Sequence, residues 1–412
     1  MRTTCCVVGG GPAGMVLGLL LARCGVPTTV LEKHADFLRD FRGDTVHAST
    51  LTLLDELGLG PAFAELPARY VTSIDVALDS GVYPFADLSR LPGPHRHIAL
   101  VPQWDLLDLL ARAGAAEPDF TLLTEAEVTG LREDGGRVSG VTYRHRDGEQ
   151  VLDADLVVGC DGRGSTTREQ SGLAYRRFGV PMDVLWFRLS RSEGDPVGGF
   201  GRFSRGCLIV LIDRGSYFQV GFVIRKGSFA RLREQGIEAF RERLVIQLPF
   251  LADRVGELGS FDDVRLLDVQ LGRLRRWATD GLLLIGDAAH AMSPVGGVGI
   301  NLAIQDAVAT ARLLAPALRT GTVSRLDLRA VQRRRWLPTV LTQTAQQVAH
   351  RLVVARAVEE RPAPRPAARR PLLMAVLDRV PALRGVPAYF VAIGVRPEEP
   401  PAAARRAAAV HG

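Results

Sequence analysis

The first 32 residues alternate between short apolar runs and one longer apolar run with helical spacing. Thr4 to Val8 predicts a short buried strand, and Pro27 to Leu31 predicts a second one. Between them, Pro12 to Cys24 predicts a helix rich in Leu and Ala, which Gly25 ends. A strand–helix–strand unit joins parallel strands, so the chain should open with an α/β unit.

The same periodicities recur further along the chain. Apolar positions at helical spacing predict helices over Thr50 to Leu57, Trp104 to Ala115 and Ile300 to Leu318. Strands are expected at Leu122 to Val128, Val138 to Tyr143, Leu156 to Gly159 and Leu282 to Ile285.

From about Tyr175 to Asp268 the pattern changes to runs rich in aromatic and β-branched residues. Antiparallel strands are expected over Val184 to Leu189, Cys207 to Ile212 and Tyr217 to Ile224, followed by one amphipathic helix over Phe229 to Val245. This segment should form a second lobe that supplies one wall of a substrate pocket. Its bulky side chains suit either an aromatic ligand or a core, and they are Trp186, Phe203, Phe218 and Phe222.

Beyond Arg333 the pattern is helical and basic. Arg361 to Pro371 is rich in Pro, Arg and Ala and indicates a linker or exposed turn. Leu372 to Val380 is apolar enough to dock on the body, and Pro400 to Gly412 should be a frayed tail.

Composition narrows the class of protein. The chain has 412 residues, 47% hydrophobic and 23% charged, which suits a globular protein of two or three lobes. The net charge of +6 comes mainly from arginine, and it either attracts an anionic ligand or reflects compositional bias. Basic residues are not interleaved with aromatic ones, so no nucleic-acid binding is inferred.

Cysteine usage and hydropathy bear on the compartment. Five cysteines without regular spacing argue against a disulfide framework, and no CxxC or His-rich cluster suggests a metal. A reducing cytoplasm fits best. The longest apolar stretch, Met15 to Leu21, is too short to span a bilayer, and the N-terminus lacks the features of a signal peptide.

The first motif with chemical content follows the first strand. Gly9, Gly11 and Gly14 have the G-x-G-x-x-G spacing between a strand and a helix. These glycines permit a tight turn, close approach of backbone N–H groups to a pyrophosphate, and close helix–strand packing. Glu32 lies 18 positions after Gly14 and could accept hydrogen bonds from both ribose hydroxyls. The motif predicts dinucleotide binding without separating FAD from NAD.

A second motif, residues 286–301, separates these cofactors. A buried strand leads into Gly286-Asp287, and the Asp could bind the polyol chain that joins the pyrophosphate to a flavin ring. The glycines before Ile300 would let the next helix N-terminus face the ring, where its dipole favours negative charge on the reduced flavin.

A third motif, Asp161-Gly162-Arg163-Gly164-Ser165, follows another buried strand, with Arg168 one turn later. Ser165 could cap a helix there. By itself this motif suits a simple strand–turn–helix joint as well as a ligand site.

In this order, the three motifs resemble those of the para-hydroxybenzoate-hydroxylase-like FAD monooxygenases, which include ubiquinone-pathway and polyketide-tailoring hydroxylases. The resemblance covers about residues 1 to 350. It implies an α/β fold with a Rossmann-like FAD-binding domain of residues 1–70, 99–174 and 269–335, an inserted antiparallel-sheet substrate domain of 71–98 and 175–268, and C-terminal helices with a tail in 336–412.

The resemblance also implies site residues. FAD would be contacted by Gly9, Gly11, Pro12, Ala13, Gly14, Glu32, Lys33, Arg42, Gln103, Val128, Asp161, Gly162, Arg168, Gly286, Asp287, Pro294, Gly297, Gly299, Ile300 and Asn301. Asp161, Gly162 and Arg168 would also serve a transient visit of NADPH or NADH. Pro294 would line the oxygen site, and His47 is a candidate catalytic group.

The implied reaction is hydroxylation of an aromatic, quinone-like or polyketide small molecule by NAD(P)H and O2 through a flavin C4a-hydroperoxide. No second G-x-G-x-x-G follows a strand, since Gly198-Gly199-Phe200-Gly201 lacks the helix it would need. Cys160 departs mildly from the usual small residue before Asp161, and the Trp-x-Trp-x-Ile-Pro signature of flavin halogenases is missing.

Other interpretations remain open at this point. The same motifs suit a flavin-dependent dehydrogenase or reductase, or a cyclase in which FAD is structural. The basic, apolar C-terminal third would allow peripheral membrane contact, although an ordinary solvated helix is the simpler interpretation. A monomer and a homodimer are both compatible with the sequence.

Overall fold

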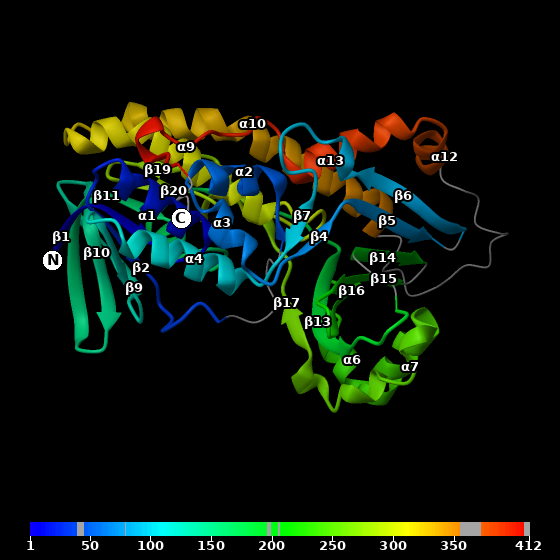
Figure 1. Ribbon diagram of the computed structural model, residues 1–412. Helices are drawn as coiled ribbons and strands as arrows, with labels where there is room; N and C mark the ends of the chain where they lie inside the picture. The colour runs from blue at the N-terminus through cyan, green and yellow to red at the C-terminus, as the bar shows by residue number, and fades with distance from the viewer. Residues whose placement is uncertain (39–44, 79, 196–198, 205–206, 355–371, 408–412) are drawn as a thin grey trace.

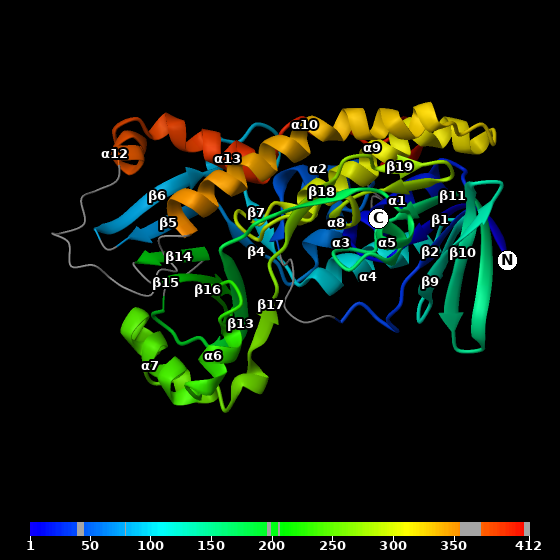
Figure 2. The same cartoon turned by 180° about the vertical axis from the view of Figure 1, so that it is seen from behind.

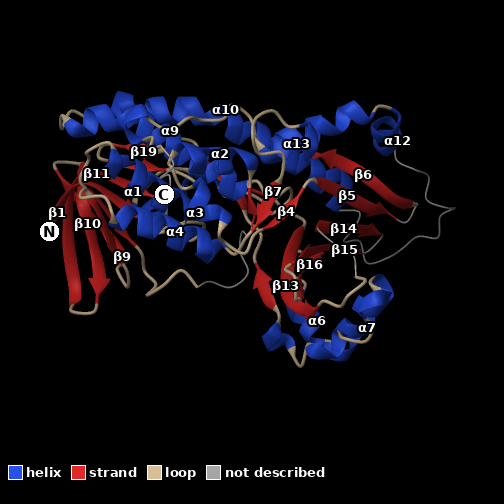
Figure 3. Ribbon diagram, viewed as in Figure 1, coloured by secondary structure: helices blue, strands red, loops and turns tan. Residues whose placement is uncertain are grey.

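A computed structural model describes residues 1–38, 45–78, 80–195, 199–204, 207–354 and 372–407. It shows an α/β lobe around the N-terminus and a second lobe built on a separate sheet, with one long helix lying along both (Figures 1 and 3). These two lobes form most of the molecule, and the residues of the three sequence motifs belong to the first one.

The core of the first lobe is a parallel sheet in the order β20 (Leu282–Leu284), β11 (Gly148–Gly159), β1 (Arg2–Val8), β2 (Thr28–Leu31) and β8 (Phe120–Leu123). Helix α1 (Pro12–Arg23) connects β1 to β2 and packs against α4 (Gln103–Ala115) and α9 (Gly299–Arg319). Residues 13–22 of this helix are all buried, which explains why apolar residues lie on every side of it. The expected opening α/β unit is confirmed.

Two expected strands of this lobe have different bounds. The run 122–128 is not one strand: β8 ends at Leu123, and β9 (Glu127–Asp134) begins after Glu125, whose φ is +54°. The strand expected at 156–159 begins earlier, at Gly148, because its first half forms a hairpin with β10 (Arg137–His145). Cys5 and Cys6 are both buried in β1.

The second lobe is a seven-stranded sheet. Its order is β17 (Arg265–Leu267), β13 (Met182–Ser190), β16 (Tyr217–Arg225), β15 (Cys207–Asp213), β14 (Gly199–Ser204), β5 (Ser73–Leu78) and β6 (Gly81–Asp87). The two segments 73–87 and 182–267, far apart in the sequence, thus share one sheet through the parallel pair β14–β5.

The two faces of this sheet have different partners. Phe218 and Phe222 pack in a core with Phe240 of α7, on the side of helices α6 (Phe229–Glu234) and α7 (Ile237–Gln247). Val184 and Trp186 belong to a separate cluster. The single helix expected over 229–245 is wrong, because Gly236 adopts a φ of +86° and divides it. The side chain of Phe203 lies outside the described residues.

Smaller elements complete the fold. They are β3 (Thr45–Val46), α2 (Ala48–Glu56), α3 (Gly60–Ala64), β4 (Arg69–Val71), β7 (Ile98–Leu100), α5 (Thr166–Gln170), β12 (Tyr175–Phe178), β18 (Leu271–Leu274), β19 (Ala278–Thr279) and α8 (Asp287–His290). Helix α8 contacts both α5 and β18, and Figure 2 shows the three elements near one another.

The C-terminal third is helical. Helix α10 (Arg325–Ala349) runs along the top of both lobes and widens into a π turn at His350–Val354. Helices α12 (Leu372–Arg379) and α13 (Gly385–Ala392) follow, while the linker expected at 361–371 lies outside the described residues. No helix in the described part of the chain is long and apolar enough to cross a membrane.

One expectation for this region is confirmed and one needs correction. Helix α12 docks on β6 and buries Met374 and Leu377, although Leu372 remains 80% exposed. The segment after Pro400 is not frayed throughout, because Ala404 is fully buried and the Arg406 N–H donates to the Glu56 carbonyl. Residues 408–412 lie outside the described residues.

A buried ionic network ties the C-terminal segments to the first lobe. The Arg335 guanidinium donates to Asp306 (Nε to Oδ1, 2.9 Å) and contacts Glu398 (Nη1 to Oε1, 3.3 Å). Asp306 also binds His290 Nε2 (2.5 Å) and the Gly286 N–H (3.2 Å). Burial would raise the pKa of Asp306, but His290 and Arg335 hold it below its ordinary value. The network therefore depends on every member being present.

We expect Arg335→Met to lower the free energy of unfolding by about 3–5 kcal/mol, because the buried Asp306 carboxylate loses its only guanidinium partner among the described residues. Glu398 keeps its ion pairs with Arg312 and Arg334. Urea unfolding followed by circular dichroism measures this. The exposed Arg333 on the same helix supplies the control Arg333→Met, which should change stability by less than about 0.5 kcal/mol. Equal effects of the two substitutions would contradict the role assigned to the network.

Candidate functional site

The three sequence motifs converge at the carboxyl edge of the parallel sheet. Gly9 follows β1, Asp161 follows β11 and Gly286 follows β20, and these three strands are adjacent and parallel. A Cβ on Gly9 would lie 2.7 Å from the Cys160 carbonyl oxygen, and one on Gly286 would lie 3.7 Å from Ala13 Cβ. In sheets of this kind, the ligand site lies at this edge.

The glycines of the first motif have separate roles. A Cβ on Gly14 would lie 1.9 Å from the Gly9 carbonyl oxygen, so Gly14 is required for the helix to pack on the strand. Gly9 has a φ of +102°, which few other residues adopt. A Cβ on Gly11 would meet no protein atom within 4 Å. Of the three spaced glycines, Gly11 is therefore the one that the packing of the protein itself does not require to be glycine.

Glu32 closes the opposite side of this loop. Its carboxylate accepts hydrogen bonds from the N–H groups of Gly10 (2.9 Å) and His34 (3.0 Å), and the residue is 2% exposed. A buried carboxylate whose acceptor sites are held by backbone donors is fixed in direction. A carboxylate oriented in this way is a suitable acceptor for ribose hydroxyls.

The polar side chains of the third motif form hydrogen bonds with each other and with the second motif. The Asp161 carboxylate accepts from the Ser165 hydroxyl (2.6 Å) and from the N–H (3.0 Å) and hydroxyl (2.8 Å) of Thr167. Ser165 caps α5, as predicted, by accepting from the Arg168 N–H at 2.9 Å. The Arg168 guanidinium donates to the carbonyls of Arg163 (2.5 Å) and Ala288 (3.2 Å). Arg168 is 7% exposed and joins the third motif to the second.

An ion pair makes a second connection between the third motif and the second motif. Arg163 Nε lies 3.1 Å from Asp287 Oδ2, with both side chains about a quarter exposed (25% and 29%). The Arg163 Nη1 atom is buried and has no hydrogen-bond partner among the described residues. Sequence reasoning did not assign Arg163, and its position within the Asp-Gly motif was the only signal available.

The glycine-rich loop of the second motif faces β3 and the start of α2. Gly296 and Gly297 have φ of +82° and +64°, conformations that favour glycine. A Cβ on Gly297 would lie 3.6 Å from Thr45 Oγ1 and 4.0 Å from His47 Nε2. The structure thus brings His47 to the loop, although more than 200 residues separate them in the sequence.

His47 is held without charge. It is 2% exposed, and its Nδ1 atom has no hydrogen-bond partner among the described residues. Burial lowers the pKa of His47 to about 4, so the imidazole is neutral near pH 7. A neutral imidazole can accept a proton or a hydrogen bond.

Asn301 anchors the start of α9. Its Oδ1 accepts from the hydroxyls of Ser49 (2.7 Å) and Thr50 (3.1 Å), and its Nδ2 contacts the Ile393 carbonyl at 3.5 Å. The side chain therefore joins α9 to α2 and to the segment after α13. Any contact with a cofactor would have to use the backbone of Asn301 or compete with these bonds.

Some of the other residues predicted to contact FAD lie near the sheet edge, and others do not. Gln103 begins α4, Ile300 is half-buried in the first turn of α9, and Gly162 has a φ of +81° at the sheet edge. Val128 is 8% exposed and packs in the main core, whereas Lys33 is exposed. Arg42 lies outside the described residues.

The edge fits a dinucleotide with a flavin. Helix α1 begins at the open Gly11 position and α9 begins behind Gly297, and in neither does the N-cap side chain bond to the helix. Uncapped N–H groups at helix N-termini bind phosphate and stabilise negative charge. Buried Glu32 and neutral His47 add a ribose acceptor at one end and a polar group at the other. The donor set therefore suits FAD.

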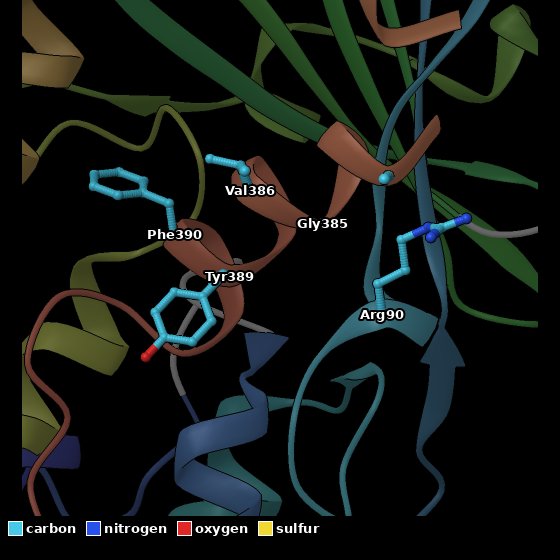
Figure 4. Close-up of a pocket in the computed structure, with 6 residues that line it drawn as sticks. Arg90, Gly385, Val386, Tyr389 and Phe390 are labelled. Atoms are coloured by element: carbon cyan, nitrogen blue, oxygen red, sulfur yellow. The ribbon is translucent and has the colours of Figure 1, made fainter. Parts of the chain in front are cut away.

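A separate hollow of about 450 Å³ lies between α13 and Arg90 (Figure 4). Val386, Tyr389 and Phe390 line it from α13. None of its lining residues belongs to the three motifs, so it is not the cofactor site.

Comparison with known proteins agrees with this geometry. The FAD binding domain family matches residues 2–344. The 6-methylpretetramide 4-monooxygenase of Streptomyces rimosus is 38% identical over 398 residues, covering 93% of this chain and 91% of that protein. The 12-dehydrotetracycline 5-monooxygenase/anhydrotetracycline 6-monooxygenase of Streptomyces rimosus subsp. rimosus is 29% identical over 374 residues, covering 84% and 69%.

A solved structure shares the fold. That of pqsL, a probable FAD-dependent monooxygenase from Pseudomonas aeruginosa, has a TM-score of 0.74 at 21% identity and covers 86% of this chain and 98% of that one. These relatives favour a monooxygenase over a dehydrogenase, a reductase or a cyclase with structural FAD. The chain belongs to the FAD-binding-domain family and is an FAD-dependent monooxygenase of the para-hydroxybenzoate-hydroxylase-like class.

Proposed function

We propose that this monooxygenase hydroxylates a fused-ring aromatic polyketide, with O2 as oxidant and NADH or NADPH as reductant. The observation that carries the substrate class is the 38% identity, over 93% of this chain, to a 6-methylpretetramide 4-monooxygenase. A second relative is named for dehydrotetracycline and anhydrotetracycline substrates.

Bound FAD would supply hydride acceptance from the nicotinamide and activation of O2. The chain's own residues would bind and orient it. The Gly9–Gly14 loop and Glu32 would hold the adenosine diphosphate half, as their N–H groups and carboxylate suit phosphate and ribose. Asp287 and the start of α9 would hold the polyol chain and ring, with Arg163 keeping the Asp287 carboxylate in place.

The second lobe would form the wall opposite the flavin loop. Val184 and Val223 lie opposite each other on neighbouring strands and pack in one cluster with Trp186 and with Val295 of the loop. Val184 and Val223 are buried, so the partly buried Trp186 and Val295 at the edge of this cluster would contact an aromatic ring system and exclude water. We propose that segments 71–98 and 175–268 act together as the substrate domain.

NAD(P)H would reduce the flavin without a dinucleotide domain of its own. Gly199 and Gly201, which resemble part of a second glycine motif, lie within strand β14 and not at a helix N-terminus. This placement supports a transient visit of the nicotinamide at the shared edge.

His47 would serve as a neutral polar group beside the reaction region. Its Nε2 atom lies on the side of the Gly297 loop, and burial keeps it uncharged. It could therefore accept a hydrogen bond from a substrate phenol.

Hydroxylation is tested directly with purified, FAD-loaded protein. We expect NADH or NADPH to bleach the flavin under anaerobic conditions, and ¹⁸O from ¹⁸O2 to enter a tetracycline-type phenol such as anhydrotetracycline or 6-methylpretetramide. Mass spectrometry of the product measures the incorporation. Bleaching without ¹⁸O incorporation into any fused-ring phenol would contradict the proposed substrate class.

Gly11→Val separates a cofactor role from a structural one. The side chain has open space within the protein, so the FAD-free variant should unfold like FAD-free wild type. FAD binding should weaken by about 100-fold, because overpacking a close contact costs up to about 3 kcal/mol. Fluorescence titration of FAD checks this.

The matched control for that experiment is Gly256→Val, since Gly256 also has open space around its Cβ position and lies in the second lobe. It should leave FAD affinity unchanged. Equal affinities for Gly11→Val and wild type would show that the pyrophosphate does not approach this loop.

The titration of His47 is a third test. Because its folded pKa is below the unfolded value of 6.5, the unfolded state takes up the proton first as pH falls. His47 therefore contributes stability above pH 6.5 that is lost towards pH 4, amounting to about 2 kcal/mol between pH 7 and pH 5. His47→Gln should flatten that slope in urea unfolding. An NMR midpoint for His47 near 6.5 would disprove the assignment.

A further inference from the structure

The loop that carries Pro294 is held from behind by helix α10. Gln346 Oε1 accepts from the Ser293 N–H (3.1 Å), and Gln346 Nε2 donates to the carbonyls of Ser293 (2.8 Å) and Val295 (3.0 Å). One side-chain amide thus binds the backbone on both sides of Pro294. Gln346 is 4% exposed, so these bonds do not compete with bulk water.

Two further residues extend this contact along the same face of the helix. Gln343 Nε2 donates to the carbonyls of Ala291 (3.1 Å) and Gly272 (2.8 Å). His350 Nε2 lies 2.8 Å from the Ser293 hydroxyl, at the start of the π turn. Spacings of three and four residues place Gln343, Gln346 and His350 on one side of the helix. Together they hold the backbone from residue 291 to 295.

A primary amide suits the central position. Residues 291–295 lie between α8 and α9 in no regular element, so their backbone groups need partners from elsewhere. An amide offers donors and an acceptor at once, which matches two carbonyls and one N–H. A carboxylate at position 346 would lose both donors and face two carbonyl oxygens.

We propose that Gln346 is a positioning residue that fixes Pro294 and the following glycines against the flavin ring, and so keeps reduction of O2 coupled to hydroxylation. The part of this inference that concerns H2O2 formation rests on the proposed function. When the loop is misplaced, NAD(P)H, one proton and O2 give NAD(P)⁺ and H2O2. When it is in place, the same reactants with the substrate give hydroxylated product, NAD(P)⁺ and water.

The test compares Gln346→Met with Gln347→Met in the FAD-loaded protein. Gln347 is the half-buried neighbour, and its side chain makes no hydrogen bond to any described residue. Hydrogen–deuterium exchange of a peptide covering 291–299 should be about 10-fold faster in Gln346→Met than in Gln347→Met, because buried amide contacts are lost. The H2O2 formed per NAD(P)H consumed should rise in Gln346→Met alone.

A second variant keeps the test decisive if Gln346→Met does not fold. In Gln346→Glu, a protonated carboxyl can donate to one carbonyl and accept from the Ser293 N–H, whereas the ionised form cannot donate. Its exchange rate over 291–299, relative to wild type at the same pH, should therefore fall as pH is lowered. Gln347→Glu should show no such dependence.

The outcomes separate this inference from the proposed function. Equal exchange and equal H2O2 yield in the Gln346 and Gln347 variants would overturn the positioning role, whatever the wild type hydroxylates. Failure of wild type to hydroxylate any fused-ring phenol would overturn the proposed function, and the exchange measurement would still decide the role of Gln346.

Discussion

The site depends on contacts that only glycine permits where three parallel strands end. The Gly14 position lies so close to the Gly9 carbonyl that any side chain there would separate helix α1 from the sheet. The Gly9 turn in turn lies against the Cys160 and Asp161 backbone, and Gly286 lies between Ala13 and Ala303. Backbone meets backbone at the first two junctions, and at the third Gly286 lies against the small side chains of Ala13 and Ala303. These contacts place three chain segments within reach of one dinucleotide.

Polar contacts then fix these segments relative to one another. Asp306 binds Gly286 and His290 on one side and Arg335 on the other, so the flavin loop is connected to α10 through a buried carboxylate. Gln346 makes a second connection three turns further along the same helix. Helix α10 thereby supports the proposed cofactor site, although it carries none of the three motifs.

The motif loops could be predicted from the sequence because the residues that determine them are close together along the chain. A glycine spacing, a preceding apolar strand and a following helix are visible within about 25 residues, and the fold class followed from them. The contacts between loops were not predictable in this way. Arg163 and Asp287 are 124 positions apart, and Gln346 is 53 positions from Ser293, so only the tertiary fold pairs them.

The errors in the predicted bounds of helices and strands also arose because the apolar pattern alone does not show backbone conformation or tertiary contacts. The apolar pattern continues through Gly236 and through Glu125, but positive φ at both positions ends the regular element. The Ala-rich tail looked unstructured by composition, whereas burial of Ala404 and a backbone bond from Arg406 to Glu56 hold it on the first lobe. Such docking depends on the shape of a distant surface, which composition does not encode.

The most direct test of the account is a crystal structure of the FAD complex. The account predicts the pyrophosphate within hydrogen-bond distance of the N–H groups at the start of α1, beside Gly11, and the flavin ring against the backbone of residues 296–299. A pyrophosphate bound elsewhere, or a ring remote from the Gly297 loop, would contradict it.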